Sequence, residues 1–165
     1  MPTGVRPTGA RVREALFSMW SERVIGASFL DLFAGSGSVG LEALSRGARH
    51  VLLVECRGKA LVSLTGNCAS LQEEDWRVQP ADLPHDLEKL PGSGSWDLVF
   101  ADPPYGFSAH RALLDGVSAL LGDAGHLAVE HSTRQELPLE DVSMKAYDRR
   151  EYGESALTFF CRPPP

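Results

Sequence analysis

The chain has no long hydrophobic run and few cysteines, and each absence excludes a class of protein. No apolar stretch among the 165 residues approaches the ~20 residues that a bilayer crossing requires, so we expect no membrane span. Residues 1–6 also lack the apolar core of a signal peptide. Cys56, Cys68 and Cys161 form no C-x-x-C pair and predict neither a disulfide framework nor a zinc knuckle. These features predict a cytoplasmic protein.

The composition is that of an ordinary globular domain. The residues are 43% hydrophobic and 23% charged, which is too apolar for a disordered chain. The five histidines show no H-x-x-x-H or H-E-x-x-H spacing, so we expect no metal site. No repeat and no interdomain linker interrupts the sequence, and we therefore expect one domain over residues 1–165.

Basic residues are outnumbered, and the imbalance is uneven along the chain. The net charge is −6, which argues against a protein that coats nucleic acid non-specifically. Residues 1–23 carry four arginines and two glutamates, a net charge of +2, so the rest of the chain carries −8. Arg6, Arg11 and Arg13 lie in this basic segment and are candidates for contacts with RNA phosphates. The alternative is a solvated helix face on which Arg13 pairs with Glu14.

Apolar runs of strand length alternate with helical patterns, which predicts an α/β fold with a parallel sheet and crossover helices. Runs such as residues 51–54 are apolar throughout, as is typical of strands covered on both faces. Helices are expected at 10–20, 39–46, 59–71 and 109–121, and strands at 28–33, 50–55, 76–80, 96–101, 127–131 and, less sharply, 143–149 and 155–162.

A glycine-rich turn follows the first predicted strand. Residues 35–40 read G-x-G-x-x-G and lead from a strand into a helix. Glycine permits the tight turn and the close approach of a ligand, while the helix N-terminus presents unpaired N–H groups. Glu55 ends the next strand, 20 residues after Gly35, where a carboxylate can accept hydrogen bonds from ribose hydroxyls. The pattern predicts a nucleotide site; the alternative is a structural turn beside a surface glutamate.

Two further acids distinguish between possible nucleotides. Asp31 lies just before the turn, where it could meet the amino group of a zwitterionic ligand but would repel a pyrophosphate. Asp82 follows the third predicted strand, where an adenine would lie, although it could simply cap the next turn. With Glu55, these acids favour S-adenosylmethionine over NAD. We expect Cys56, next to Glu55, to be a buried small hydrophobe.

A second motif, residues 102–105, follows the fourth predicted strand. The two prolines remove two N–H donors, so the Asp102 carboxylate and the Pro103 carbonyl remain as acceptors. Such a loop can hold both protons of an exocyclic amine on a base, and Tyr105 offers a face on which the base can stack. Asp102 is then an acceptor rather than a strong base, because a carboxylate cannot deprotonate a neutral amine. The alternative is a rigid turn with a packed tyrosine.

These motifs resemble those of a known family. Residues 31–37 are similar to motif I, and residues 102–105 to motif IV, of amino-methylating class I methyltransferases. The chain resembles the RsmD-like family more closely, and this resemblance covers essentially the whole chain. It rests on four segments: Arg6-Pro7-Thr8, Arg11-Val12-Arg13-Glu14-Ala15-Leu16-Phe17, Gly40-Leu41-Glu42-Ala43-Leu44-Ser45-Arg46-Gly47-Ala48 and Tyr152-Gly153-Glu154-Ser155-Ala156-Leu157.

The resemblance implies a fold and an activity. The fold is Rossmann-like, a seven-stranded, mostly parallel sheet with helices on both faces and the last strand antiparallel. The activity is methylation of the N2 amine of a guanine in 16S ribosomal RNA, within a 30S subunit or an assembly intermediate. The cofactor is S-adenosylmethionine, with S-adenosylhomocysteine as product and no metal. We expect a monomer.

The resemblance also implies roles for individual residues. It implies a methionine-binding turn, a ribose-binding acid, an adenine-binding pair and an acceptor loop that holds the target amine. The corresponding residues are Asp31, Phe33, Ala34, Gly35 and Gly37 for the turn, Glu55 for the ribose, Asp82 and Leu83 for the adenine, and Asp102, Pro103, Pro104 and Tyr105 as the catalytic loop.

The chain departs from the family pattern at two places, and three rival functions remain open. Family members usually begin with a basic β-hairpin that we expect to be missing here, and Gly9-Ala10 replaces their Thr-Asp. The rivals are an adenine-N6 methyltransferase acting on DNA or RNA, a non-catalytic RNA-binding assembly factor with the same fold, and an NAD-linked oxidoreductase.

Overall fold

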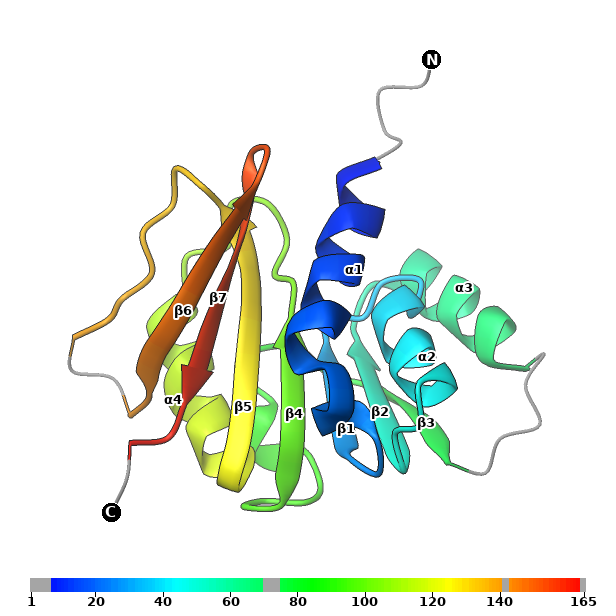
Figure 1. Ribbon diagram of the computed structural model, residues 1–165. Coiled ribbons are helices and arrows are strands. Elements are labelled where there is room, and N and C mark those ends of the chain that lie inside the picture. The colour runs from blue at the N-terminus through cyan, green and yellow to red at the C-terminus, as the bar shows by residue number, and fades with distance from the viewer. Residues whose placement is uncertain (1–6, 70–74, 141–142, 164–165) are drawn as a thin grey trace.

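One seven-stranded sheet with helices on both sides organises the chain (Figure 1). The computed structural model describes residues 7–69, 75–140 and 143–163. Its α-helices are α1 (Pro7–Trp20), α2 (Ser38–Ser45), α3 (Gly58–Ala69) and α4 (His110–Leu120), its 3-10 helices are η1 (Ser21–Val24) and η2 (Leu87–Lys89), and its strands are β1 (Ser28–Leu32), β2 (His50–Glu55), β3 (Trp76–Pro80), β4 (Trp96–Ala101), β5 (Leu121–Ser132), β6 (Lys145–Tyr152) and β7 (Ser155–Cys161).

The strand order is β3-β2-β1-β4-β5-β7-β6. The first five strands in this order, β3, β2, β1, β4 and β5, are parallel to one another. Strand β7 runs antiparallel to both β5 and β6, which confirms the expected antiparallel last strand. The carboxyl ends of the parallel strands therefore meet at one edge, which is the upper edge in Figure 1. The β6–β7 turn and the first residues of α1 lie at the same edge.

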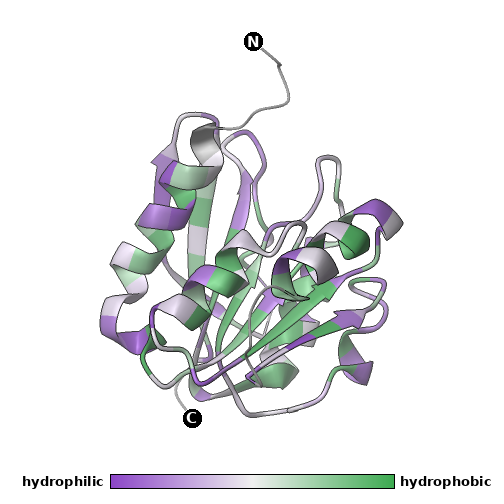
Figure 2. Cartoon of the chain, turned by 90° about the vertical axis from the view of Figure 1, so that its right-hand side faces the viewer, coloured by the Kyte–Doolittle hydropathy of each residue, from purple (hydrophilic) through white to green (hydrophobic). Residues whose placement is uncertain are grey.

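Each face of the sheet carries its own hydrophobic layer. On one face, buried side chains of α1 such as Phe17 and Trp20 pack against Phe29 of β1 and Phe159 of β7. On the other face, α4 and the segment before β4 cover the sheet. All five residues of β1 are buried, which explains why its sequence lacks the alternation of a half-exposed strand. Figure 2 shows hydrophobic residues along the strands and hydrophilic ones on the outer sides of the helices.

Several element boundaries differ from the predicted ones, among them β6, which spans Lys145–Tyr152 rather than 143–149, and two of the differences have identifiable reasons. Helix α1 begins at Pro7, because the fixed φ of proline suits the first helical position. Strand β5 begins at Leu121 rather than at 127, through a register irregularity opposite Trp96 and Leu98. Gly125 lies so close to the Trp96 carbonyl that a Cβ there would approach it to 2.7 Å, and this glycine concealed the strand pattern. None of the helices in the described part of the chain is long and apolar enough to cross a membrane.

Candidate active site

The glycine-rich turn connects β1 to α2 at the carboxyl edge of the sheet. Gly35 and Gly37 have φ angles of 58° and 85°, which residues with a side chain rarely adopt. A Cβ on Gly37 would also collide with Cδ1 of Leu64 in α3. Gly37 is the N-cap of α2 and offers no capping side chain. The turn therefore brings bare backbone to the edge at which ligands bind in open α/β folds.

Asp31, in β1, lies beneath this turn and is 1% exposed. Its Oδ2 accepts a hydrogen bond from the backbone N–H of Gly40 at 2.9 Å. Burial raises the pKa of Asp31 to about 8; the Gly40 hydrogen bond opposes this shift, and the nearby charges of Asp102 and Glu55 add to it. At pH 7 the carboxyl group is therefore mostly protonated, and a cationic group beside it would favour ionisation.

Glu55, at the end of β2, is surrounded by donors. Its carboxylate accepts hydrogen bonds from the backbone N–H groups of Gly35, Cys56 and Arg57 at 2.9 to 3.0 Å. The Arg57 guanidinium donates two more, at 3.0 and 3.1 Å. Burial alone would raise the pKa of Glu55, but the hydrogen bonds outweigh it and lower the pKa to about 2. Glu55 thus presents a permanent negative charge beside the turn.

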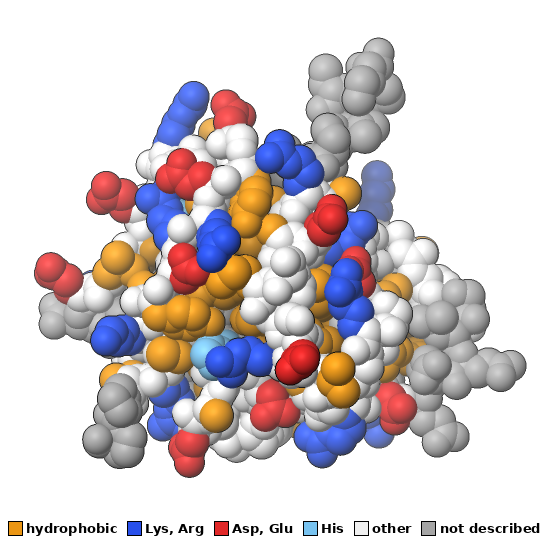
Figure 3. All heavy atoms as spheres, viewed as in Figure 1, with side chains coloured by type: hydrophobic (Ala, Val, Ile, Leu, Met, Phe, Trp, Pro, Cys, Tyr) orange, Lys and Arg blue, Asp and Glu red, His pale blue; other side chains and the backbone are white. Residues whose placement is uncertain are grey.

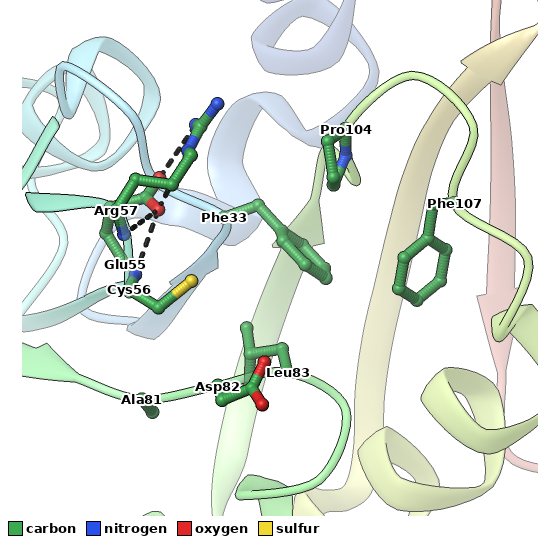
Figure 4. Close-up of a pocket in the computed structure, with 9 residues that line it drawn as sticks. All are labelled: Phe33, Glu55, Cys56, Arg57, Ala81, Asp82, Leu83, Pro104 and Phe107. Atoms are coloured by element: carbon green, nitrogen blue, oxygen red, sulfur yellow. Dashed lines mark hydrogen bonds and ion pairs between the residues drawn. The ribbon is translucent and has the colours of Figure 1, made fainter.

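A cavity of about 180 Å³ lies between the turn, the end of β2 and the segment after β3 (Figure 4). The ring of Phe33 projects into it and meets Phe107 edge-on, with centroids 5.4 Å apart. Asp82 is exposed and Leu83 is buried on the facing segment. The lining residues are Phe33, Glu55, Cys56, Arg57, Ala81, Asp82, Leu83, Pro104 and Phe107.

Cys56 corrects an expectation from the sequence. It is exposed rather than buried, and it lines the cavity, with its sulfur directed away from Glu55 in Figure 4. The reason is its position: β2 ends at Glu55, so Cys56 is the first residue beyond the sheet and not part of its interior.

The acceptor loop, residues 102–105, follows β4 directly. The backbone N–H of Asp102 approaches the carbonyl of Leu32, the last residue of β1, at 3.4 Å. Tyr105 is 99% exposed, so the alternative of a packed tyrosine is wrong. A cleft of about 1020 Å³ opens beside this loop. The residues that line it are Asp102, Pro103, Pro104, Tyr105, Gly106, His110, Glu130, His131, Ser132, Arg134, Gln135, Gly153, Glu154 and Ser155.

Pro104 connects the two spaces, because it lines both the cavity and the cleft. A small molecule in the cavity and a larger one in the cleft would therefore meet at the acceptor loop. Group transfer between two bound molecules requires this kind of proximity.

A family model described as Conserved hypothetical protein 95 matches residues 1–161. This chain belongs to that family. It is 34% identical over 166 residues to Ribosomal RNA small subunit methyltransferase D of Escherichia coli K12, a match that covers 96% of this chain and 80% of the relative. The resemblance to the RsmD-like family is thereby confirmed.

Solved structures agree with the fold class. A conserved hypothetical protein of Streptococcus pyogenes is 30% identical, with a TM-score of 0.81 over 92% of this chain and 95% of that one. An S-adenosylmethionine dependent methyltransferase of Mesorhizobium loti is 16% identical, with a TM-score of 0.70 over 90% of this chain and 96% of that one. The second likeness concerns the fold alone. The expected Rossmann-like methyltransferase fold is confirmed.

The arginines of the basic segment, residues 1–23, are only partly available to a ligand. Arg6 lies outside the described residues, and Arg11 is exposed on α1. Arg13 does not pair with Glu14 as the alternative interpretation had it: its Nε lies 2.8 Å from Oε1 of Glu42 in α2. Glu42 also pairs with Arg46 at 2.7 Å, so Arg13 belongs to an ion-pair network that joins α1 to α2.

The structure places further residues at the cavity and the cleft that the sequence reasoning missed. Arg57 and Phe107 line the cavity, and either could have been noticed from its place two residues after a predicted site residue. Glu130 and His131 reach the cleft because β5 ends there, and residues at the ends of parallel strands are the signal that could have identified them. His110 reaches it from the first position of α4. Residues 7–69, 75–140 and 143–163 contain no group of three or more metal-ligating side chains.

Proposed function

We propose that this chain is an S-adenosylmethionine-dependent methyltransferase that methylates the exocyclic N2 amine of a guanine in small-subunit ribosomal RNA. The observation that carries the proposal is the position of Pro104 between a cavity suited to a nucleoside and a cleft large enough for a base with its neighbours. The Escherichia coli relative, named as an rRNA methyltransferase, supports the choice of ribosomal RNA.

The residues present fit S-adenosylmethionine. Asp31 and Glu55 bring acidic groups to the glycine turn, and a molecule with a sulfonium and an ammonium group favours such acids. Phe33 and Leu83 give the cavity apolar walls, and Asp82 adds an acceptor. We assign Asp31, Ala34, Gly35 and Gly37 to the methionine part, Glu55 to the ribose, and Asp82 and Leu83 to the adenine. Phe33, which the sequence placed with the methionine-binding turn, is assigned to the adenine instead, because its ring lines the cavity with Asp82 and Leu83. S-adenosylmethionine supplies a methyl group that needs no further activation.

The acceptor loop then acts on the target base. The Asp102 carboxylate and the Pro103 carbonyl accept the two N–H protons of the amine, which directs the nitrogen lone pair away from the loop and toward the cavity. The base leaves its stack and lies against Tyr105, whose ring is fully accessible. Asp102 is too weak a base to remove an amine proton before transfer. The N–C bond would form as the C–S bond of the cofactor breaks, and the strongly acidic methylated amine would then give its proton to Asp102 or to water.

Surface charge supports a substrate that is presented by a folded particle. Figure 3 shows basic and acidic side chains interspersed over one face, without a large field of one sign. On β6, Arg149 lies 3.3 Å from Glu151 and Arg150 lies 3.4 Å from Asp148. Arginines that already pair with carboxylates of the same chain hold phosphates weakly. We therefore propose that the substrate is a 30S particle or assembly intermediate in the cytoplasm, in which the RNA has a defined shape that free RNA lacks.

The test is methylation of 16S ribosomal RNA, 30S particles and DNA side by side with labelled S-adenosylmethionine. We expect N2-methylguanosine, with 30S particles preferred. N6-methyladenine as the product would replace the proposal by its first rival, and absence of labelled methyl in every substrate would favour an assembly factor. Calorimetry with S-adenosylhomocysteine and NADH tests the cofactor: tight binding of NADH alone would overturn the assignment.

A further inference from the structure

We infer that Glu130 is a specificity-determining residue: beside Asp102, its carboxylate accepts the N1–H of the target guanine and so rejects adenine. The inference rests on the proposed function, and it names the side chain that would favour guanine over adenine, the target base of the first rival function.

The register of the sheet brings the two carboxylates together. Ala101 of β4 pairs with Val129 of β5 in parallel register. The next residue along each strand is Asp102 and Glu130, so these two occupy neighbouring positions at the carboxyl edge. Neighbouring strands lie about 4.8 Å apart. Both residues line the same cleft, and both are partly buried rather than free in solvent.

The two bases differ at the position next to the amine. In guanine the N2 amine is adjacent to N1–H, so two donors lie side by side. In adenine the N6 amine is adjacent to N1, which carries a lone pair and accepts. An ionised carboxylate only accepts hydrogen bonds. Asp102 and Glu130 together therefore complement the guanine edge, whereas adenine would oppose its N1 lone pair to a carboxylate and leave an acceptor unpaired.

A third group offers polar atoms to a ligand in this cleft. His110 is 6% exposed and lines the cleft, and its ring contacts Phe107 edge-on at 4.9 Å. Within the described part of the chain its ring nitrogens make no hydrogen bond. The other buried imidazole is different: His131 uses one nitrogen on the carbonyl of Ser132 at 2.8 Å and the other on the hydroxyl of Thr158 at 2.7 Å.

The contrast between the two histidines separates structure from binding. The nitrogens of His131 are occupied within the fold, so this side chain joins β5 to β7. Burial lowers the pKa of His110, which is therefore neutral at pH 7 and carries one donor and one acceptor. A base that enters the cleft could therefore use either ring nitrogen of His110.

The variants E130A and E130Q test the inference, with E136Q as the matched control at an exposed position outside the cleft lining. The readouts are kcat/KM on 30S particles, the ratio of N2-methylguanosine to N6-methyladenosine by mass spectrometry, and the affinity for S-adenosylhomocysteine. We expect E130A to lower kcat/KM on guanine about 5- to 150-fold, the range for one hydrogen-bonding contact to a base edge. Cofactor affinity should not change, and the melting temperature of each variant shows how much of any loss comes from the fold.

The E130Q variant gives the sharper result, because its amide can turn to donate to adenine N1. We expect the adenine share of the product to rise in E130Q and to stay at the wild-type value in E136Q. A merely structural role for Glu130 would lower the yield without changing this ratio. Wild-type kcat/KM on guanine and an unchanged ratio in both variants would overturn the inference alone. A wild-type protein that forms no N2-methylguanosine would instead overturn the proposed function on which the inference rests.

Discussion

The carboxylate of Glu55 accepts a hydrogen bond from the backbone N–H of Gly35 at 2.9 Å. The two residues are 20 positions apart, at the end of β2 and in the turn after β1. One side chain thus holds the glycine turn in position and borders the cavity. Organisation of the turn and binding at its edge depend on the same carboxylate.

E55Q should lower the free energy of unfolding at pH 7 by about 1–3 kcal/mol. This figure is smaller than the pKa shift alone would give, because Arg57 is exposed and solvent weakens its ion pair with Glu55. The pKa of Glu55 is about 2 in the folded protein, below the ordinary 4.5, so its stabilisation is present above pH 4.5 and is lost as the pH falls toward 2. Urea unfolding at pH 7 and pH 3 measures this. E14Q, at an exposed position of α1, is the control. An equal effect of E55Q at both pH values would contradict the prediction.

D31N should change the pH dependence of stability in the opposite sense. The folded protein retains the Asp31 proton up to about pH 8, while an unfolded aspartate releases it near pH 3.8. Wild-type stability therefore falls as the pH rises from 4 to 8, and Asn removes this cost, on the order of 2–5 kcal/mol at pH 9. The melting temperature of D31N relative to wild type should rise between pH 5 and pH 9. Parallel profiles would show that Asp31 titrates normally.

D31N should also alter proton release on cofactor binding. A cationic ligand next to Asp31 favours the ionised carboxylate, so wild-type protein should release a proton when S-adenosylmethionine binds at pH 7. Calorimetry in buffers of different ionisation enthalpy counts that proton. The prediction fails if D31N releases as much as wild type does.

D102A should abolish methyl transfer and leave affinity for S-adenosylhomocysteine nearly intact. Asp102 lines the cleft and not the cavity, so its removal affects the target amine rather than the cofactor. D102N keeps one acceptor oxygen and should retain partial activity. Single-turnover transfer of labelled methyl to 30S particles is the measurement. Wild-type turnover by D102A would contradict the role of acceptor.

Y105A should lower kcat/KM about 5- to 150-fold, which corresponds to the loss of ~1–3 kcal/mol of stacking on the base. Y105F retains the aromatic face and should differ little from wild type. Neither variant should change the melting temperature, because the Tyr105 side chain is 99% exposed and packs against nothing that folding requires. Equal activity of Y105A and Y105F would remove stacking from the mechanism.

G37A should destabilise the fold by about 2–4 kcal/mol and weaken cofactor binding. The substitution introduces a side chain at a φ of 85° and drives its Cβ into Leu64. G58A is the matched control, since a Cβ at Gly58 meets nothing within 4 Å and its φ is not positive. Denaturant unfolding compares the two variants. Similar stability of G37A and G58A would show that the turn yields to accommodate a side chain.

The local sequence was sufficient for much of the sheet. The predicted bounds of β2, β3 and β4 agree with the structure. In β2 and β4 an apolar run is bordered by turn residues, whereas β3 alternates apolar and polar residues. The start of β5 could not be predicted, because Gly122 and Gly125 interrupt the apolar run, and the pairing of Leu121 with Trp96 resumes only at His126 after a register shift. The exposure of Cys56 was missed although the end of β2 was predicted correctly, because the exposure of a residue just beyond a strand depends on which distant segments cover that edge of the sheet.

By itself the sequence determined the two motifs, the glycine turn of residues 35–40 and the acceptor loop of residues 102–105, since each is local chemistry that depends on backbone freedom or rigidity. Only the tertiary structure decided how they act together. Parallel pairing of β1 with β4 and of β4 with β5 brings their carboxyl ends to one edge, so that Pro104 borders both cavity and cleft and Glu130 lies beside Asp102. Strand register sets these neighbours, and register is a relation between distant segments that no local pattern contains.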